Sequence, residues 1–169
     1  MSDPKPDHPI DPGVEIGHVH LKVSDIDRAL DFYSGVLGFE LQARMGADAA
    51  FISAGAYHHH IGLNTWQSRG GSPPPPGTTG LFHTAIRYPT RRALADAVTR
   101  VREAGIRLDG ASDHGVSEAI YLRDPDQNGV ELYWDRPRED WPKDPAQPSG
   151  YAMFTAPLDL ADLLSELES

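Results

Sequence analysis

The sequence contains no cysteine, which excludes disulfide bonds, thiolate metal ligands and a cysteine nucleophile. Any bound metal would therefore be held by nitrogen and oxygen atoms, and the eight histidines are the first candidates. No stretch approaches the roughly 20 apolar residues that a membrane-spanning helix needs. Residues 1–13 also lack the apolar core of a signal peptide. We therefore expect a cytoplasmic protein with no membrane partner.

Basic residues are few compared with acidic ones. The 15 Lys and Arg residues against 25 Asp and Glu residues give a formal net charge of −10 at pH 7. Nucleic acids and anionic membranes bind proteins through basic surfaces, so neither is expected as a partner. With 169 residues the chain is long enough for one compact domain and short for two.

The same order of predicted elements occurs twice along the chain. Residues 17–23 alternate apolar and polar side chains as a half-buried strand does. Residues 24–38 carry an apolar stripe at helical spacing, with Ser24 as the predicted N-cap and Gly38 as the C-terminal cap. Three strands are then predicted at 39–46, 49–55 and 57–66. The second series consists of a strand at 81–88, a helix at 90–105 and strands at 106–110, 118–124 and 129–135.

The two series have a nearly constant period, which indicates an internal duplication. His18 and His83 lie at corresponding points of the first strands, 65 residues apart, and Gly38 and Gly105 follow the two helices, 67 residues apart. Each series is a β-α-β-β-β module. The predicted organisation is an N-terminal arm at 1–13, a single domain at 14–141 and a tail at 142–169. Within the domain, module 1 covers 14–66, a proline-rich linker covers 67–80 and module 2 covers 81–134.

The tail ends in a predicted short amphipathic helix. Four leucines fall on one helical face, namely Leu160, Leu163, Leu164 and Leu167. This face would pack on the domain or form a contact in a homodimer, and we expect a homodimer.

The predicted fold class is α+β, with two tandem modules forming a cup-shaped mixed sheet. A helix covers one face of each module, so the other faces would enclose a cup lined by corresponding strands. Val130 and Leu132 face the helix and direct Glu131 into the cup, where His18 and His83 also converge. Two imidazoles and one carboxylate leave coordination positions open, as in non-haem Fe(II) oxygenases. Taken singly, a strand histidine is more often a surface or core residue.

Several stretches of the chain carry a family resemblance that extends from Gly17 to Trp141. The superfamily in question is the vicinal oxygen chelate superfamily, which includes extradiol dioxygenases, glyoxalase I, fosfomycin-resistance proteins and methylmalonyl-CoA epimerase. Its start and end signatures resemble GHVHLKVSDIDRALDFYSGVLGFE and LRDPDQNGVELY. Catechol 2,3-dioxygenases of the extradiol class are most similar to YHHHIGLNTW, GLFHTAIRYPTR and DHGVSEAIYLRDPDQNGVELYWDRP.

The resemblance implies an Fe(II)-dependent enzyme that opens a small aromatic diol with O2 to a muconic semialdehyde. Carried over residue by residue, it implies that the metal ligands are His18, His83 and Glu131. It further implies three catalytic residues. His59 would act as the base that removes a proton from the catechol, Tyr121 would donate a hydrogen bond to a bound hydroxyl oxygen, and His114 would hold a substrate oxygen or gate entry.

The histidine run leaves alternatives open. If Ile61 and Leu63 face the helix, strand alternation directs His58 and His60 into the cup, whereas the resemblance favours His59. A loop before the strand would reconcile the two. If His60 reaches the metal instead, the site resembles that of glyoxalase I, whose chemistry needs a Lewis-acid metal and no oxygen.

Other questions also stay open at this point. The ligand set fits manganese as well as iron. An epimerase-like metal enzyme is a further alternative, and so is a metal-free binding or resistance protein that uses the same cup. His20 shares a strand face with His18 and is expected to line the cup or its rim.

Overall fold

The computed structural model describes residues 7–168 and contains the β-α-β-β-β order twice. Module 1 comprises β1 (Val19–Lys22), α1 (Ile26–Leu30) with a π-helical continuation η1 (Asp31–Val36), β2 (Glu40–Met45), β3 (Ala49–Ser53) and β4 (Ile61–Asn64). Module 2 comprises β5 (Thr84–Arg87), α2 (Arg91–Glu103), β6 (Leu108–Asp113), β7 (Ser117–Arg123) and β8 (Gly129–Asp135). After β8 the chain forms the 3-10 turn η2 (Arg138–Asp140), and the tail adds β9 (Ala156–Pro157) and α3 (Leu160–Ser165).

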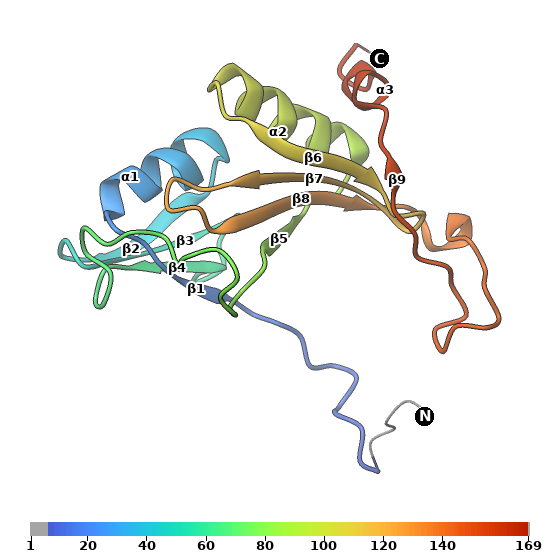
Figure 1. The fold of residues 1–169 in the computed structure, drawn as a ribbon, viewed down its shortest axis with the longest axis horizontal. Coiled ribbons are helices and arrows are strands. Elements are labelled where there is room, and N and C mark those ends of the chain that lie inside the picture. The colour runs from blue at the N-terminus through green and yellow to red at the C-terminus, as the bar shows by residue number, and fades with distance from the viewer. Residues whose placement is uncertain (1–6, 169) are drawn as a thin grey trace.

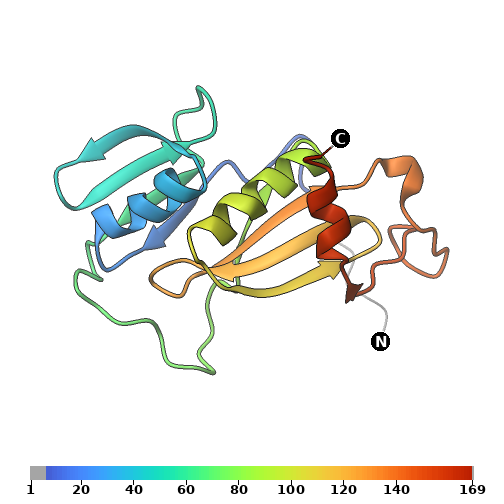
Figure 2. The ribbon, with the colours of Figure 1, turned by 90° about the horizontal axis from the view of Figure 1, so that it is seen from above.

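Each module builds its own sheet, and the two sheets follow the same plan. The orders are β1-β4-β3-β2 and β5-β8-β7-β6-β9, with β1–β4 and β5–β8 parallel and the other pairs antiparallel. Both β2 and β6 carry a register shift, before Ala43 and Gly110 respectively. In Figures 1 and 2 the helices α1 and α2 lie on the same side of the two sheets. The α+β duplication predicted from the sequence is confirmed, with two mixed sheets in place of one. We call the sheet face opposite the helices the open face.

Helix α1 begins one residue later than the sequence pattern predicts. Asp25 has extended backbone angles, and its carboxylate accepts a hydrogen bond from the Arg28 amide at 2.8 Å. The Ser24 hydroxyl instead accepts from the Arg28 guanidinium at 2.6 Å. The prediction of Ser24 as the N-cap was therefore wrong, because two adjacent residues had capping side chains and only backbone geometry chose between them. At the other end Gly38 has φ +87°, as a C-terminal cap requires.

We expect Asp25→Ala to lower the free energy of unfolding by about 0.5–2 kcal/mol, the usual cost of losing an N-cap. Ser24→Ala is the matched control and should change it by less than about 0.5 kcal/mol, as exposed substitutions do. Urea denaturation of both variants measures the difference. A larger loss in Ser24→Ala than in Asp25→Ala would contradict the assignment of the cap.

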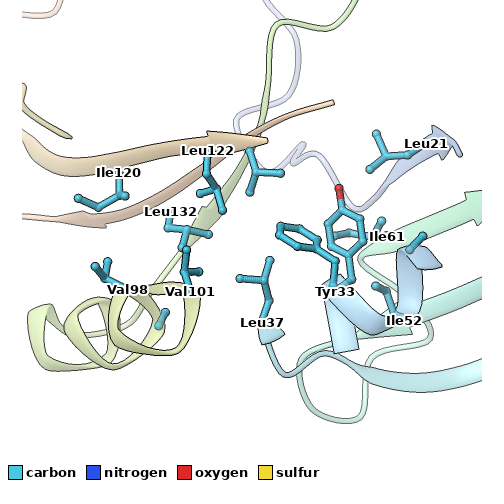
Figure 3. Packing of buried hydrophobic residues seen from close by; sticks show 14 of the residues in the cluster. Leu21, Tyr33, Leu37, Ile52, Ile61, Val98, Val101, Ile120, Leu122 and Leu132 are labelled. Atoms are coloured by element: carbon cyan, nitrogen blue, oxygen red, sulfur yellow. The ribbon is translucent and has the colours of Figure 1, made fainter. Parts of the chain in front are cut away.

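The two modules share one hydrophobic core beneath the helices. Figure 3 shows side chains of α2, β7 and β8 on one side and of β1, η1, β3 and β4 on the other, with Leu37 between them. Leu132 of β8 is fully buried in this cluster and points toward α2 together with Val130. Since successive side chains of a strand point to opposite faces, Glu131 faces the open side.

The tail returns to pack against module 2. Leu163 of α3 is fully buried, and α3 lies against α2. Arg91, at the start of α2, fixes this arrangement through ion pairs with three carboxylates: Glu118 at 2.8 Å, Asp162 at 2.7 Å and Glu166 at 2.9 Å. Glu118 is buried, so salt screens its ion pair with Arg91 less than the pair with the exposed Asp162. Within residues 7–168, no helix is both long enough and apolar enough to cross a bilayer.

Candidate metal centre

His83 and Glu131 meet on the open face of module 2. His83 directly precedes β5, which pairs in parallel with β8 so that Ala85 lies opposite Glu131. The Nε2 atom of His83 lies 2.8 Å from Oε2 of Glu131, and the Glu131 side chain is 12% exposed. The duplicated β-α-β-β-β order thus places two residues that are 48 positions apart in direct contact.

The spacing of this pair suits a divalent metal. Two ligand atoms about 2.1 Å from one ion and at right angles to each other lie about 3 Å apart, close to the separation seen here. His83 Nδ1 is buried and has no hydrogen-bond partner in the described part of the chain. An unsatisfied buried nitrogen lowers stability, so folding alone does not explain a histidine at this position.

His18 lies on the same cavity as His83 but apart from the pair. It directly precedes β1, as His83 precedes β5, and both line a cavity of about 620 Å³ between the modules together with His60 and Tyr133. The imidazole of His18 is exposed and lies 4.4 Å from that of His59, measured between ring centroids. Among residues 7–168, no three His, Asp or Glu side chains form a group that could hold a metal. The structure therefore brings together two of the three predicted ligands and places the third on the wall of the same cavity.

Tyr121 and His114 extend the pair into a hydrogen-bonded chain. Tyr121 of β7 lies opposite Glu131 of β8, and its hydroxyl donates to Glu131 Oε1 at 3.2 Å. The same hydroxyl lies 2.7 Å from Nε2 of His114, which occupies the turn between β6 and β7. Partial burial and the Glu131 carboxylate raise the pKa of Tyr121 to about 12. Tyr121 is therefore protonated at neutral pH and able to donate a hydrogen bond.

The three consecutive histidines lie in a loop, because β4 begins only at Ile61. Strand alternation therefore does not govern their directions. The ring of His59 packs 5.1 Å from Phe51 and beside His18. Partial desolvation and the neighbouring His18 imidazole lower the pKa of His59, so His59 is neutral at pH 7. His60 Nδ1 accepts a hydrogen bond from the Ala54 amide at 3.2 Å.

The two modules differ at the position of the carboxylate. Strand pairing aligns Gly62, opposite His20 in β1, with Glu131, opposite Ala85 in β5. Module 1 therefore supplies no carboxylate at the equivalent place. A Cβ atom at position 62 would lie 2.3 Å from the His20 ring, so the glycine lets His20 lie across β4 toward Phe51 and Trp66. The pairing of HIGLN with GVELY in the sequence would have indicated this difference.

Comparison with known proteins identifies the family of this chain. The family described as the glyoxalase/bleomycin resistance protein/dioxygenase superfamily matches residues 15–132. The chain belongs to this superfamily. The matched residues run from before β1 into β8 and include all three predicted metal ligands.

Two curated proteins are similar to this chain over most of its length. Catechol-2,3-dioxygenase of Bacillus subtilis (strain 168) is 37% identical over 89% of this chain and 51% of its own length. Biphenyl-2,3-diol 1,2-dioxygenase 3 of Rhodococcus globerulus is 34% identical over 71% of this chain and 63% of its own length. The chain thus spans about half to two-thirds of the length of these relatives.

A solved structure supports the fold. The structure of a glyoxalase/dioxygenase from Nostoc punctiforme superposes with a TM-score of 0.63 at 20% identity, covering 79% of this chain and 100% of that one. At this level of identity the likeness extends to the fold only.

Proposed function

We propose that this superfamily member is an Fe(II)-dependent extradiol dioxygenase that opens a catechol-type substrate. The observation that carries the proposal is the His83–Glu131 pair with the Tyr121–His114 chain attached to its carboxylate. The similarity to two dioxygenases of aromatic diols supports it. Bound iron, held by His18, His83 and Glu131, would supply activation of dioxygen and a site for both catechol oxygens. Both atoms of O2 would enter the product as the ring C–C bond beside the hydroxyls breaks.

The remaining residues have roles that follow from their contacts. His59 is neutral and lies beside His18, so it is placed to accept the proton that a catechol loses on binding. Tyr121 keeps its proton at neutral pH and can donate to a substrate oxygen. Its hydroxyl has one proton, which it can give to Glu131 or to a second acceptor but not to both. His114, on the far side of Tyr121, would keep that hydroxyl oriented.

Reconstitution tests the proposal directly. The protein is loaded anaerobically with Fe(II), and catechol and air are then added while oxygen uptake and near-ultraviolet absorbance are recorded. Yellow ring-opened semialdehyde with one O2 consumed per catechol supports extradiol cleavage. Bound iron with no oxygen consumption across catechol, methylcatechols and biphenyl-2,3-diol would refute it. Replacing Fe(II) with Mn(II) in the same assay tests the alternative metal.

We expect His59→Gln to lower kcat by about 100-fold, the lower end of what general-base catalysis contributes. The wild-type kcat/KM should fall on the acid side below about pH 6.5, the ordinary histidine value, because the lowered pKa keeps His59 a base down to that range. The variant should lose this acid limb. His8→Gln, an exposed histidine in the N-terminal segment, is the control and should keep both rate and profile. An unchanged acid limb in His59→Gln would assign the base elsewhere.

A lyase or epimerase that uses a Lewis-acid metal is the second candidate. One observation favours it, since His60 lines the cavity shared by His18 and His83 and could become a fourth ligand. Two observations speak against it. His60 Nδ1 accepts a hydrogen bond from a main-chain amide, and its ring stacks on Tyr57. Module 1 also has Gly62, and no carboxylate, at the position equivalent to Glu131. Loss of metal on His60→Gln, with no oxygen consumption in the wild type, would support this candidate.

Location in the cytoplasm and a homodimeric state remain predictions.

A further inference from the structure

The tail crosses the turn that carries His114. We call residues 150–157 the C-terminal strap. Its last two residues form β9, which pairs antiparallel with β6 so that Ser112 lies opposite Pro157 and Asp113 opposite Ala156. The strap therefore becomes the outermost strand of the module 2 sheet immediately before the His114 turn (Figure 1).

The main chain of Phe154 contacts His114 through both its carbonyl oxygen and its amide. Its carbonyl oxygen lies 2.8 Å from His114 Nδ1, and its amide donates to the His114 carbonyl at 3.4 Å. A carbonyl oxygen can only accept a hydrogen bond, so Nδ1 of His114 must carry a hydrogen. The opposite ring nitrogen, Nε2, then has no hydrogen and faces the Tyr121 hydroxyl at 2.7 Å. His114 Nε2 is therefore the second acceptor, which competes with Glu131 for the single proton of Tyr121. One main-chain contact thus determines both the direction of the ring and the identity of the nitrogen presented to Tyr121.

The close fit of the strap on the turn depends on a glycine. Gly115 has φ +77°, and a Cβ atom there would lie 2.6 Å from the Phe154 ring and 2.8 Å from Pro142. Any side chain at position 115 would push the strap away from His114. Because Gly115 has no side chain, the strap can contact the neighbouring His114.

The strap is anchored on both sides of this contact. After β9 the chain enters α3, which the Arg91 ion pairs hold against α2, and before Phe154 the Ala152 amide donates to the Pro142 carbonyl at 2.8 Å. Arg136 also joins Asp113, at the end of β6, to the buried Glu118 of β7. A main-chain carbonyl held at several points is a rigid hydrogen-bond acceptor.

We propose that the C-terminal strap is part of the active site and that Phe154 is a positioning residue, whose main-chain carbonyl holds His114 as the Nδ1–H tautomer with Nε2 directed at Tyr121. The catalytic consequence rests on the proposed dioxygenase function. The tautomer itself does not, because the contact that determines it involves only atoms of His114 and Phe154. Failure of this inference and failure of the proposed function can therefore be told apart.

The direct test is nitrogen-15 NMR of the histidine ring nitrogens in the full-length metal-free protein, with His114 assigned by comparison with His114→Gln. We expect His114 Nδ1 to have the shift of a protonated ring nitrogen and to keep it in Phe154→Ala, which removes the ring and retains the carbonyl. An Nε2–H tautomer, or an even mixture in the wild type, would overturn the proposal.

Gly115→Ala tests the consequence, with Gly105→Ala as the matched control. Both glycines have φ near +70°, but a Cβ atom at position 105 meets nothing within 4 Å, so the two variants share backbone strain and differ in the clash with the strap. We expect Gly115→Ala to give mixed His114 tautomers and, in the iron-loaded enzyme, a kcat lowered by about 100-fold, as misplacement by about 1 Å can cause, with KM little changed. Gly105→Ala should show neither effect.

Equal changes in the two variants, or a single Nδ1–H tautomer in Gly115→Ala, would contradict the proposal. If Gly115→Ala does not fold, the wild-type and Phe154→Ala spectra still decide.

Discussion

Glu131→Gln lowers the affinity for Fe(II) by more than about 100-fold and removes oxygen consumption with catechol. Removal of a group that only orients a metal ligand costs about 10–100-fold in affinity, so loss of a ligand should cost more. The amide keeps the size of the carboxylate and can still accept from Tyr121 and contact His83, at the Oε1 and Oε2 positions respectively. We therefore expect the free energy of unfolding to change by less than about 1.5 kcal/mol, the net worth of one hydrogen bond.

Metal content after anaerobic reconstitution and dialysis, oxygen uptake and urea denaturation measure these effects together. Glu40→Gln is the control, because Glu40 begins β2 and is exposed. Stoichiometric iron in Glu131→Gln would contradict the assignment of Glu131 as a ligand. Loss of metal in a folded variant would fit a lost ligand, whereas loss of folding would make the variant uninformative about metal and call for Glu131→Asp.

Leu132→Ala should instead lower the free energy of unfolding and leave iron content and kcat near wild type. Leu132 is fully buried, faces α2 and lies between Ile86 and Ile120 in the sheet. Replacing a buried leucine by alanine removes apolar burial and leaves a cavity, which costs about 2–5 kcal/mol of unfolding free energy. Since its side chain points away from the open face, we expect iron content and kcat to stay near wild type at temperatures where the variant is folded.

Leu41→Ala is the matched control for this measurement, because Leu41 is 49% exposed on β2. It should change the free energy of unfolding by less than about 0.5 kcal/mol. A loss below about 1 kcal/mol in Leu132→Ala would show that the core around β8 relaxes to fill the cavity. A loss of metal in folded Leu132→Ala would show instead that packing on the helix side controls the geometry of the site. We thus expect substitution of Glu131 to affect metal binding and substitution of the neighbouring Leu132 to affect stability, although both residues belong to β8.

How far the site could be predicted depended on the kind of signal at each position. Strand alternation around Val130 and Leu132 placed Glu131 on the open face, and the duplication placed His83 beside it. The same reasoning placed His18 at the equivalent point of module 1, but not its distance from the pair, because that distance depends on how two separate sheets sit against each other. The histidine run was harder, since residues 58–60 form a loop and follow no strand period.

Sequence alone determined the duplicated β-α-β-β-β order, the absence of thiolate chemistry and the direction of Glu131. These features follow from periodicity and composition, which are local properties of the chain. Only the tertiary structure revealed that Phe154 meets His114, 40 residues earlier in the sequence. The contact is made by a main-chain carbonyl, which every residue possesses, so no side chain marks it in the sequence. Its position is decided by the packing of α3 and the pairing of β9, which are non-local interactions.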